Sequence, residues 1–110
     1  MTSSEDRITV ALLKCDVVES THLPADAMSL IHDAVEFATS GYGVEPGYTP
    51  WNGDGATAYF VGADGALRAV SAALDAVERV RLIPNYQISL RASVGVDEVP
   101  DPSIDRVLKL

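Results

Sequence analysis

Two aspartates stand where carboxylates could act together on a divalent cation. Asp16 ends an apolar run, and Asp54 lies in the turn sequence Asn52-Gly53-Asp54-Gly55. Magnesium and manganese take oxygen ligands, and magnesium sites usually combine one or two carboxylates with water and substrate phosphates. Two such ions can activate a ribose hydroxyl group and neutralise a leaving pyrophosphate. The glycines beside Asp54 permit close backbone approach. These residues therefore suit chemistry on a nucleoside triphosphate, provided that the fold brings them together.

The same residues also have a purely structural interpretation. An aspartate after a strand can cap the following helix, and Asn-Gly-Asp-Gly forms a hairpin turn without any ligand. His22 and His32 are isolated and give no zinc-binding pattern. Cys15, the single cysteine, fits a small buried residue in a strand. Spacing alone leaves the metal-binding and the structural interpretations open.

The hydrophobic pattern predicts the elements that must position the two aspartates. Residues 8–18 form a β-branched apolar run, which predicts a central strand with both faces covered. Helical spacing predicts a first helix over about 24–40, with Ala27, Ile31, Ala34/Val35 and Ala38 on its apolar face. A second helix is predicted over 64–80, with an apolar face of Leu67, Val70, Leu74 and Val77.

The remaining strands are predicted from turn residues and from alternation. Residues 48–51 and 56–61 read as a hairpin around the Asn-Gly-Asp-Gly turn, although Pro46 and Pro50 weaken its first strand. Residues 88–96 alternate apolar and polar side chains, which indicates a half-buried strand. Ser103 could cap a short C-terminal helix.

The order strand-helix-strand-strand-helix-strand predicts a ferredoxin-like α+β fold with an antiparallel sheet. We expect a single domain over 1–110, with a flexible N-terminus at 1–7 and a C-terminal tail at 100–110. In this fold the first strand and the central hairpin are neighbours, so Asp16 and Asp54 are expected to meet at one edge of the sheet. The fold by itself assigns no function, because many unrelated activities share it.

Composition narrows the classes of partner. The 110 residues carry a formal net charge of −8. This charge argues against binding to nucleic acid, which requires clustered lysine and arginine, and against docking on an anionic membrane. No apolar run reaches the length of a membrane span, and the polar N-terminus does not resemble a secretory signal. With one cysteine and no possible intrachain disulfide, a cytoplasmic location is expected.

Three motifs in sequence order resemble those of class III nucleotidyl cyclases, the adenylate and guanylate cyclases. They are Asp16-Val17-Val18-Glu19-Ser20-Thr21, then Asn52-Gly53-Asp54-Gly55 with Ala58-Tyr59-Phe60, and Leu90-Arg91-Ala92-Ser93-Val94-Gly95-Val96. The resemblance covers roughly residues 8–99. It implies that Mg²⁺ or Mn²⁺ is held by Asp16, Asp54 and the backbone carbonyl of Val17. It further implies nucleotide contacts at Gly53, Gly55 and Thr21, although Thr21 also reads as a turn or capping residue.

The chain also departs from the family pattern. Pro50 stands where the family has a purine-selecting lysine or glutamate. The segment from Ile104 resembles a family Val-Asn-x-x-x-Arg segment whose asparagine and arginine act in catalysis, but here Asp105 and Lys109 stand at those two positions. Lysine lacks the planar two-pronged guanidinium, and Asp105 would place negative charge near a triphosphate. The tail then ends, so the resemblance implies a domain truncated at its C-terminus.

Three functions follow as alternatives. The favoured one is a divergent cyclase-like domain with impaired catalysis that binds nucleotide and metal or dimerises in signalling. The second is an active cyclase that converts a nucleoside triphosphate to a cyclic nucleotide and pyrophosphate as a dimer. In either case the expected partner is a second copy or another cyclase-like chain. The third is a ferredoxin-like protein-interaction domain without nucleotide.

Overall fold

The helices and strands follow one another in the predicted order. The structure is a computed structural model, and it describes residues 7–18, 23–44, 49–52 and 55–100. The elements are β1 Arg7–Val17, α1 Ala25–Gly41, β2 Thr49–Asn52, β3 Gly55–Val61, α2 Gly65–Arg81 and β4 Leu90–Pro100. This is the β-α-β-β-α-β arrangement of the ferredoxin-like fold, as predicted.

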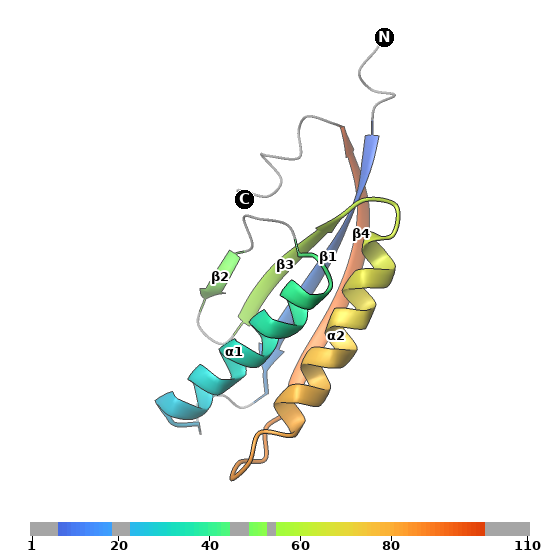
Figure 1. Cartoon of the computed structure of the whole chain (residues 1–110). Coiled ribbons are helices and arrows are strands. Elements are labelled where there is room, and N and C mark those ends of the chain that lie inside the picture. Colours follow the sequence, from blue (N-terminus) through green and yellow to red (C-terminus); the bar gives the residue numbers. More distant parts are fainter. Residues whose placement is uncertain (1–6, 19–22, 45–48, 53–54, 101–110) are drawn as a thin grey trace.

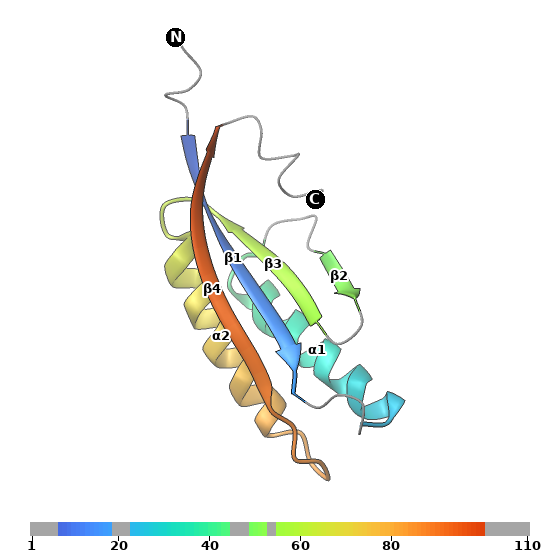
Figure 2. The same ribbon diagram turned by 180° about the vertical axis from the view of Figure 1, so that it is seen from behind.

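The four described strands form one antiparallel sheet in the order β2-β3-β1-β4. Both described helices lie on the same face of the sheet (Figure 1), and none of the described residues forms a helix on the opposite face (Figure 2). β1 is central, with β3 on one side and β4 on the other. Its register places Asp16 opposite Gly55 on β3 and opposite Arg91 on β4.

β1 is central as predicted, but the prediction that both of its faces are covered is wrong toward its end. Ala11, Leu13 and Cys15 point to the helices and are at most 4% exposed. On the other face, Lys14 is exposed and Asp16 is half-buried. The helices therefore cover one face only, and the charged end of β1 opens on the other.

The apolar face of α1 is confirmed, whereas the predicted face of α2 is wrong at three of its four residues. The fourth, Val77, is partly buried against the core. Ala27, Ile31, Val35 and Ala38 of α1 are all buried. On α2 the buried residues are mainly small, and Leu67, Val70 and Leu74 are 70%, 44% and 68% exposed. The cause is close packing of α2 on the sheet: a Cβ added at Gly65 would lie 2.4 Å from the Phe60 carbonyl oxygen. The buried side of α2 consists of Gly65, Ala69, Ala72, Ala73, Ala76 and Val80.

The element boundaries differ from the predictions in small ways. β4 begins at Leu90 rather than 88, and it continues to Pro100, where a tail was expected. Arg7, placed in a flexible N-terminus by the prediction, begins β1 and donates a 2.8 Å hydrogen bond to the Glu98 carbonyl. The predicted helix after Ser103 lies outside the described residues. Among those described, neither helix is long and apolar enough to cross a membrane.

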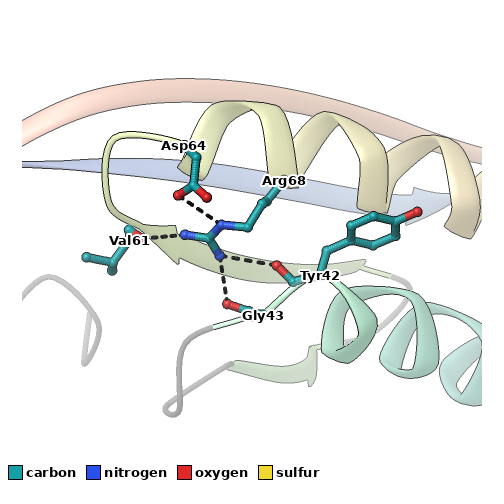
Figure 3. A network of polar contacts seen from close by, with 5 residues as sticks. All are labelled: Tyr42, Gly43, Val61, Asp64 and Arg68. Carbon is teal, nitrogen blue, oxygen red and sulfur yellow. Dashed lines mark hydrogen bonds and ion pairs between the residues drawn. The ribbon is translucent and has the colours of Figure 1, made fainter.

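Arg68 on α2 joins three parts of the covered face (Figure 3). Its guanidinium donates hydrogen bonds to the carbonyls of Tyr42 and Gly43, at 3.1 and 3.0 Å, and to the carbonyl of Val61. An ion pair of 3.1 Å with Asp64 holds the same group from the start of α2. Arginine suits this role because its planar fork presents several donors at once. The contacts fix the end of α1 against the end of β3.

Candidate functional site

Asp16 is the described residue with the clearest potential for metal chemistry. It lies near the end of β1, and the alternation of the strand places its side chain on the face of the sheet that the helices leave open. Its side chain is 41% exposed, so water and a ligand can reach the carboxylate. The alternation of β1 produces this placement, because Cys15 and Val17 on either side point into the core.

The carboxylate of Asp16 is held by Arg91 across the β1–β4 pair. Arg91 Nε lies 3.1 Å from Asp16 Oδ1, and Arg91 Nη2 lies 3.2 Å from Asp16 Oδ2. This two-pronged geometry is the one that guanidinium and carboxylate groups favour. Because the Arg91 side chain is 72% exposed, the pair remains in contact with solvent and is exchangeable. Asp16 therefore already has a cationic partner from within the chain.

Gly55 brings the central hairpin against Asp16. It pairs directly with Asp16, and a Cβ added to it would lie 3.3 Å from the Cys15 carbonyl oxygen and 3.7 Å from Asp16 Cβ. A larger residue would crowd the strand exit, in agreement with the predicted need for close approach. Gly55 also directly follows Asp54 in the sequence. The register therefore brings the start of β3 to the same end of β1 as Asp16.

Other predicted site residues are not tested by these contacts. Val17 pairs with Leu90, and its side chain is buried, whereas its proposed contribution is a backbone carbonyl. Its role as a metal ligand stays a prediction. The remaining predicted site residues lie outside the described part of the chain: Thr21, Gly53, Asp54, Asp105 and Lys109.

Cys15 is a core residue and not a nucleophile of this site. Its side chain is 4% exposed and points to the helices. Burial, with a smaller contribution from the Asp16 carboxylate, raises the pKa of the Cys15 thiol to about 11. The thiol is thus protonated at neutral pH, in agreement with its predicted structural role.

The described residues fit a divalent cation only in part. Among the residues that the structure describes, no three His, Cys, Asp or Glu side chains are grouped to hold a metal ion. Asp16 supplies one carboxylate of the type that Mg²⁺ prefers, but Arg91 already occupies it. A metal at this position therefore requires that Asp16 exchange its guanidinium partner for the ion and that ligands come from elsewhere, such as Asp54.

A second surface feature is less suited to a nucleotide. A hollow of about 490 Å³ on α1 is lined by Asp33, Glu36, Phe37, Ser40 and Gly41. Its two carboxylates would repel a triphosphate. Phe37 in its wall instead contacts α2, where the Arg79 guanidinium lies 4.3 Å from the ring centroid. Through Phe37 the hollow on α1 lies beside Arg79 of α2.

This chain is similar in structure to several solved cyclase domains. The guanylyl cyclase domain of the RhoGC fusion protein from the aquatic fungus Blastocladiella emersonii has a TM-score of 0.66 at 19% identity, covering 83% of this chain and 61% of that one. A rhodopsin-guanylyl cyclase core with converted specificity has a TM-score of 0.69 at 20% identity, with coverage of 83% and 56%. A bacterial light-regulated adenylyl cyclase has a TM-score of 0.69 at 16% identity, with coverage of 84% and 55%.

The chain therefore has the fold of a class III nucleotidyl cyclase catalytic domain, as the sequence motifs implied. At these identities the likeness shows the fold alone. The chain spans less than two thirds of the length of these cyclase structures. No family model and no curated protein matches it by sequence.

Sequence reasoning missed that Arg91 is the partner of Asp16. Two signals were available, since a ferredoxin-like sheet places the last strand beside the first, and Arg91 falls among the polar residues of the alternating pattern. The pattern indicates the open face but not the register. Because a shift by two residues would have placed Ser89 or Ser93 beside Asp16, only the observed pairing identifies Arg91.

Proposed function

We propose that this chain is a cyclase-like signalling domain that binds a divalent cation and a nucleoside triphosphate and has lost most or all cyclase activity. It acts in the cytoplasm as a homodimer or with another cyclase-like chain. The cyclase fold supports the ligand class, and the rhodopsin-guanylyl cyclase core with this fold is in complex with ATPαS. The acidic composition fits a small-molecule ligand better than nucleic acid.

The observation that carries this proposal is the pairing of Asp16 with Arg91. Asp16 lies beside the central hairpin, so the fold retains a carboxylate for a metal ion. Its bidentate contact with Arg91 opposes metal binding, because the ion must displace a guanidinium. Weakened metal binding, together with Pro50, Asp105 and Lys109 at the recognition and catalytic positions, favours impaired catalysis over full activity.

An active cyclase is the second candidate, and the exposure of the ion pair favours it. The Arg91 and Asp16 side chains are 72% and 41% exposed, so water can replace either partner at small cost. In this case a partner chain would supply the recognition residues that this chain lacks. Formation of a cyclic nucleotide would distinguish an active cyclase from the binding domain with impaired catalysis.

The test combines thermal unfolding with product analysis. The chain is mixed with Mn²⁺ and ATP, GTP, CTP or UTP in turn, and the unfolding temperature and any cyclic nucleotide are measured. A binding domain is stabilised by about 2.7 kcal/mol at a ligand concentration one hundred times Kd, without product. An active cyclase also yields cyclic nucleotide. Neither stabilisation nor product would leave only a protein-interaction domain without nucleotide.

Two variants make the test specific. Asp16→Asn removes the carboxylate with little change of shape, and it should abolish the Mn²⁺-dependent stabilisation. Asp33→Asn removes the same charge from the exposed surface of α1 and should leave the stabilisation unchanged. Equal stabilisation of the Asp16→Asn variant would show that the ligand binds elsewhere.

A further inference from the structure

One edge of the described sheet is formed by a long strand. β4 has 11 residues and pairs with β1 along one side, and no described residue pairs with its other side (Figure 2). Its central residues 92–96 carry no charge. Edge strands of monomeric proteins are usually short or carry charges, proline or bulges that prevent pairing with another chain. The β2 edge follows that rule, with four residues, Pro50 and a register shift.

The helix above this edge has an apolar flank. Leu67, Val70 and Leu74 follow the spacing of a single helical stripe, and they are 70%, 44% and 68% exposed. An α-helix that buries one face in the core normally carries polar residues on the opposite face. The surface formed by Leu67, Val70 and Leu74, here called the α2 stripe, is therefore unexplained by the fold of one chain.

The α2 stripe lies on the outer side of α2, and Val70 is the residue of the stripe that is turned most toward the β4 side of the molecule. α2 packs on β1 and β4 with α1 beside it. Arg68 and Arg79 mark the side of α2 that faces α1, because they contact Tyr42 and Phe37 there. Val70 lies two residues from Arg68, which is a rotation of about 200° around the helix. Val70 thus points away from α1, toward the open edge.

β4 is complementary to itself in one antiparallel register. If two copies pair about Val94, Arg91 of each copy stands opposite Asp97 of the other, and Ala92 stands opposite Val96. Val96, which belongs to the helix-covered face, is 55% exposed in one chain. Opposite charges directly across an antiparallel pair are stabilising.

The spacing of the helices fits the same arrangement. Neighbouring strands lie about 4.8 Å apart. In a sheet continued through two β4 strands, each α2 sits over its own β1–β4 pair, so the two helices are two strand spacings apart. The resulting distance of about 10 Å is that of packed helices.

We infer that two copies of this chain pair antiparallel along their β4 edges, forming one continuous sheet with the two α2 stripes packed against each other. The inference gives a location to the dimerisation named in the proposed function. The inferred dimer requires neither metal nor nucleotide. A failure of the proposed ligand binding would therefore leave the inferred dimer untouched, and the reverse also holds.

The experiment measures the mass of the chain by sedimentation over a range of concentrations, without metal or nucleotide. The wild type should dimerise. Leu74→Glu should raise the dimer dissociation constant about a hundredfold, because each copy loses a buried leucine and gains a charge. Leu30→Glu, on α1 and 45% exposed, is the matched control and should leave the dimer intact.

A charge exchange tests the register. Asp97→Arg and Arg91→Asp should each weaken the dimer about fivefold or more, because like charges then face each other twice. The double variant Arg91→Asp/Asp97→Arg should restore it, with circular dichroism confirming the fold of all variants.

A wild type that stays monomeric at every concentration would overturn the inference. So would a dimer that none of these variants weakens, because it would use another surface. Hydrogen exchange tells whether the β4 edge is covered by a second copy or by the same chain. A monomer whose β4 amides all exchange slowly would show that the chain covers its own edge.

Discussion

The two faces of the sheet are built from alternating residues of the same strands, yet they carry different properties. On β1, Leu13 and Cys15 lie in the core under the helices, whereas Lys14 and Asp16 between and after them face away from the helices. The covered face holds the packing of both helices, and the open face holds Asp16, the described carboxylate that is a candidate metal ligand. Substitutions on the covered face of a strand should therefore change the stability of the fold, whereas substitutions on the open face of the same strand should change ligand binding. Each of the following predictions tests that separation.

The largest effect is expected from the covered face of β3. Phe60 is fully buried, and Phe60→Ala should lower the free energy of unfolding by about 3–5 kcal/mol through lost burial and a cavity. Thr57→Ala, on the open face of the same strand, should cost about 1 kcal/mol or less. Chemical unfolding measures both variants. Equal losses would mean that the open face contributes to the core.

Arg68 should give the next largest loss. Arg68→Ala removes the bonds to three carbonyls that hold α1 and β3 together, and we expect a loss of about 1.5–3 kcal/mol. The exposed Arg81, which pairs only with Glu78 among the contacts described, provides the comparison: Arg81→Ala should leave the free energy of unfolding nearly unchanged. A smaller loss for Arg68→Ala than for Arg81→Ala would contradict the joining role.

The burial of Cys15 predicts a pH dependence. Its thiol has a pKa of about 11 in the folded chain against 9.0 when exposed. Below pH 9 both states hold the proton, so there is no effect. Between pH 9 and 11 the unfolded chain releases it first, and stability falls as pH rises, by about 2 kcal/mol. Unfolding at several pH values should show this loss in the wild type relative to Cys15→Ala. Parallel pH profiles would mean that Cys15 is accessible.

The smallest change in stability is expected at the Asp16–Arg91 pair. Arg91→Gln should alter the free energy of unfolding by about 1 kcal/mol or less, since the pair is exposed. It should nevertheless tighten Mn²⁺ binding about twofold to fivefold by releasing the carboxylate. Titration followed by Mn²⁺ electron paramagnetic resonance measures the affinity. Unchanged affinity in Arg91→Gln, with binding still lost in Asp16→Asn, would show that Arg91 does not compete.

The fold could be predicted from the sequence because its signals are local. The alternation of β4 and the spacing of Ala27, Ile31 and Val35 depend on neighbours in the chain. The apolar face of α2 could not be predicted in this way. Large side chains were expected in the core, but the helix lies so close to the sheet that alanines fill the contact and Leu67 and Leu74 remain outside.

The sequence predicts only those parts of the candidate site that follow from the order and pairing of the strands. Asp16 follows from the end of an apolar strand, and its neighbour Gly55 follows from the hairpin that pairs with that strand. The guanidinium of Arg91 could not be assigned, because the register between β1 and β4 depends on the packing of the whole sheet. Asp54 stays a prediction.

Gly65 has a consequence for how the chain could change during evolution. Because the Phe60 carbonyl would lie 2.4 Å from any Cβ at this position, every substitution must lift the first turn of α2 from the sheet. Arg68 lies one turn further along the same helix, so its reach to Val61 and Gly43 would change with that displacement. A single methyl group added at position 65 would thus disturb the hydrogen bonds that hold the C-terminal end of α1. Compensating substitutions would then be needed in both helices.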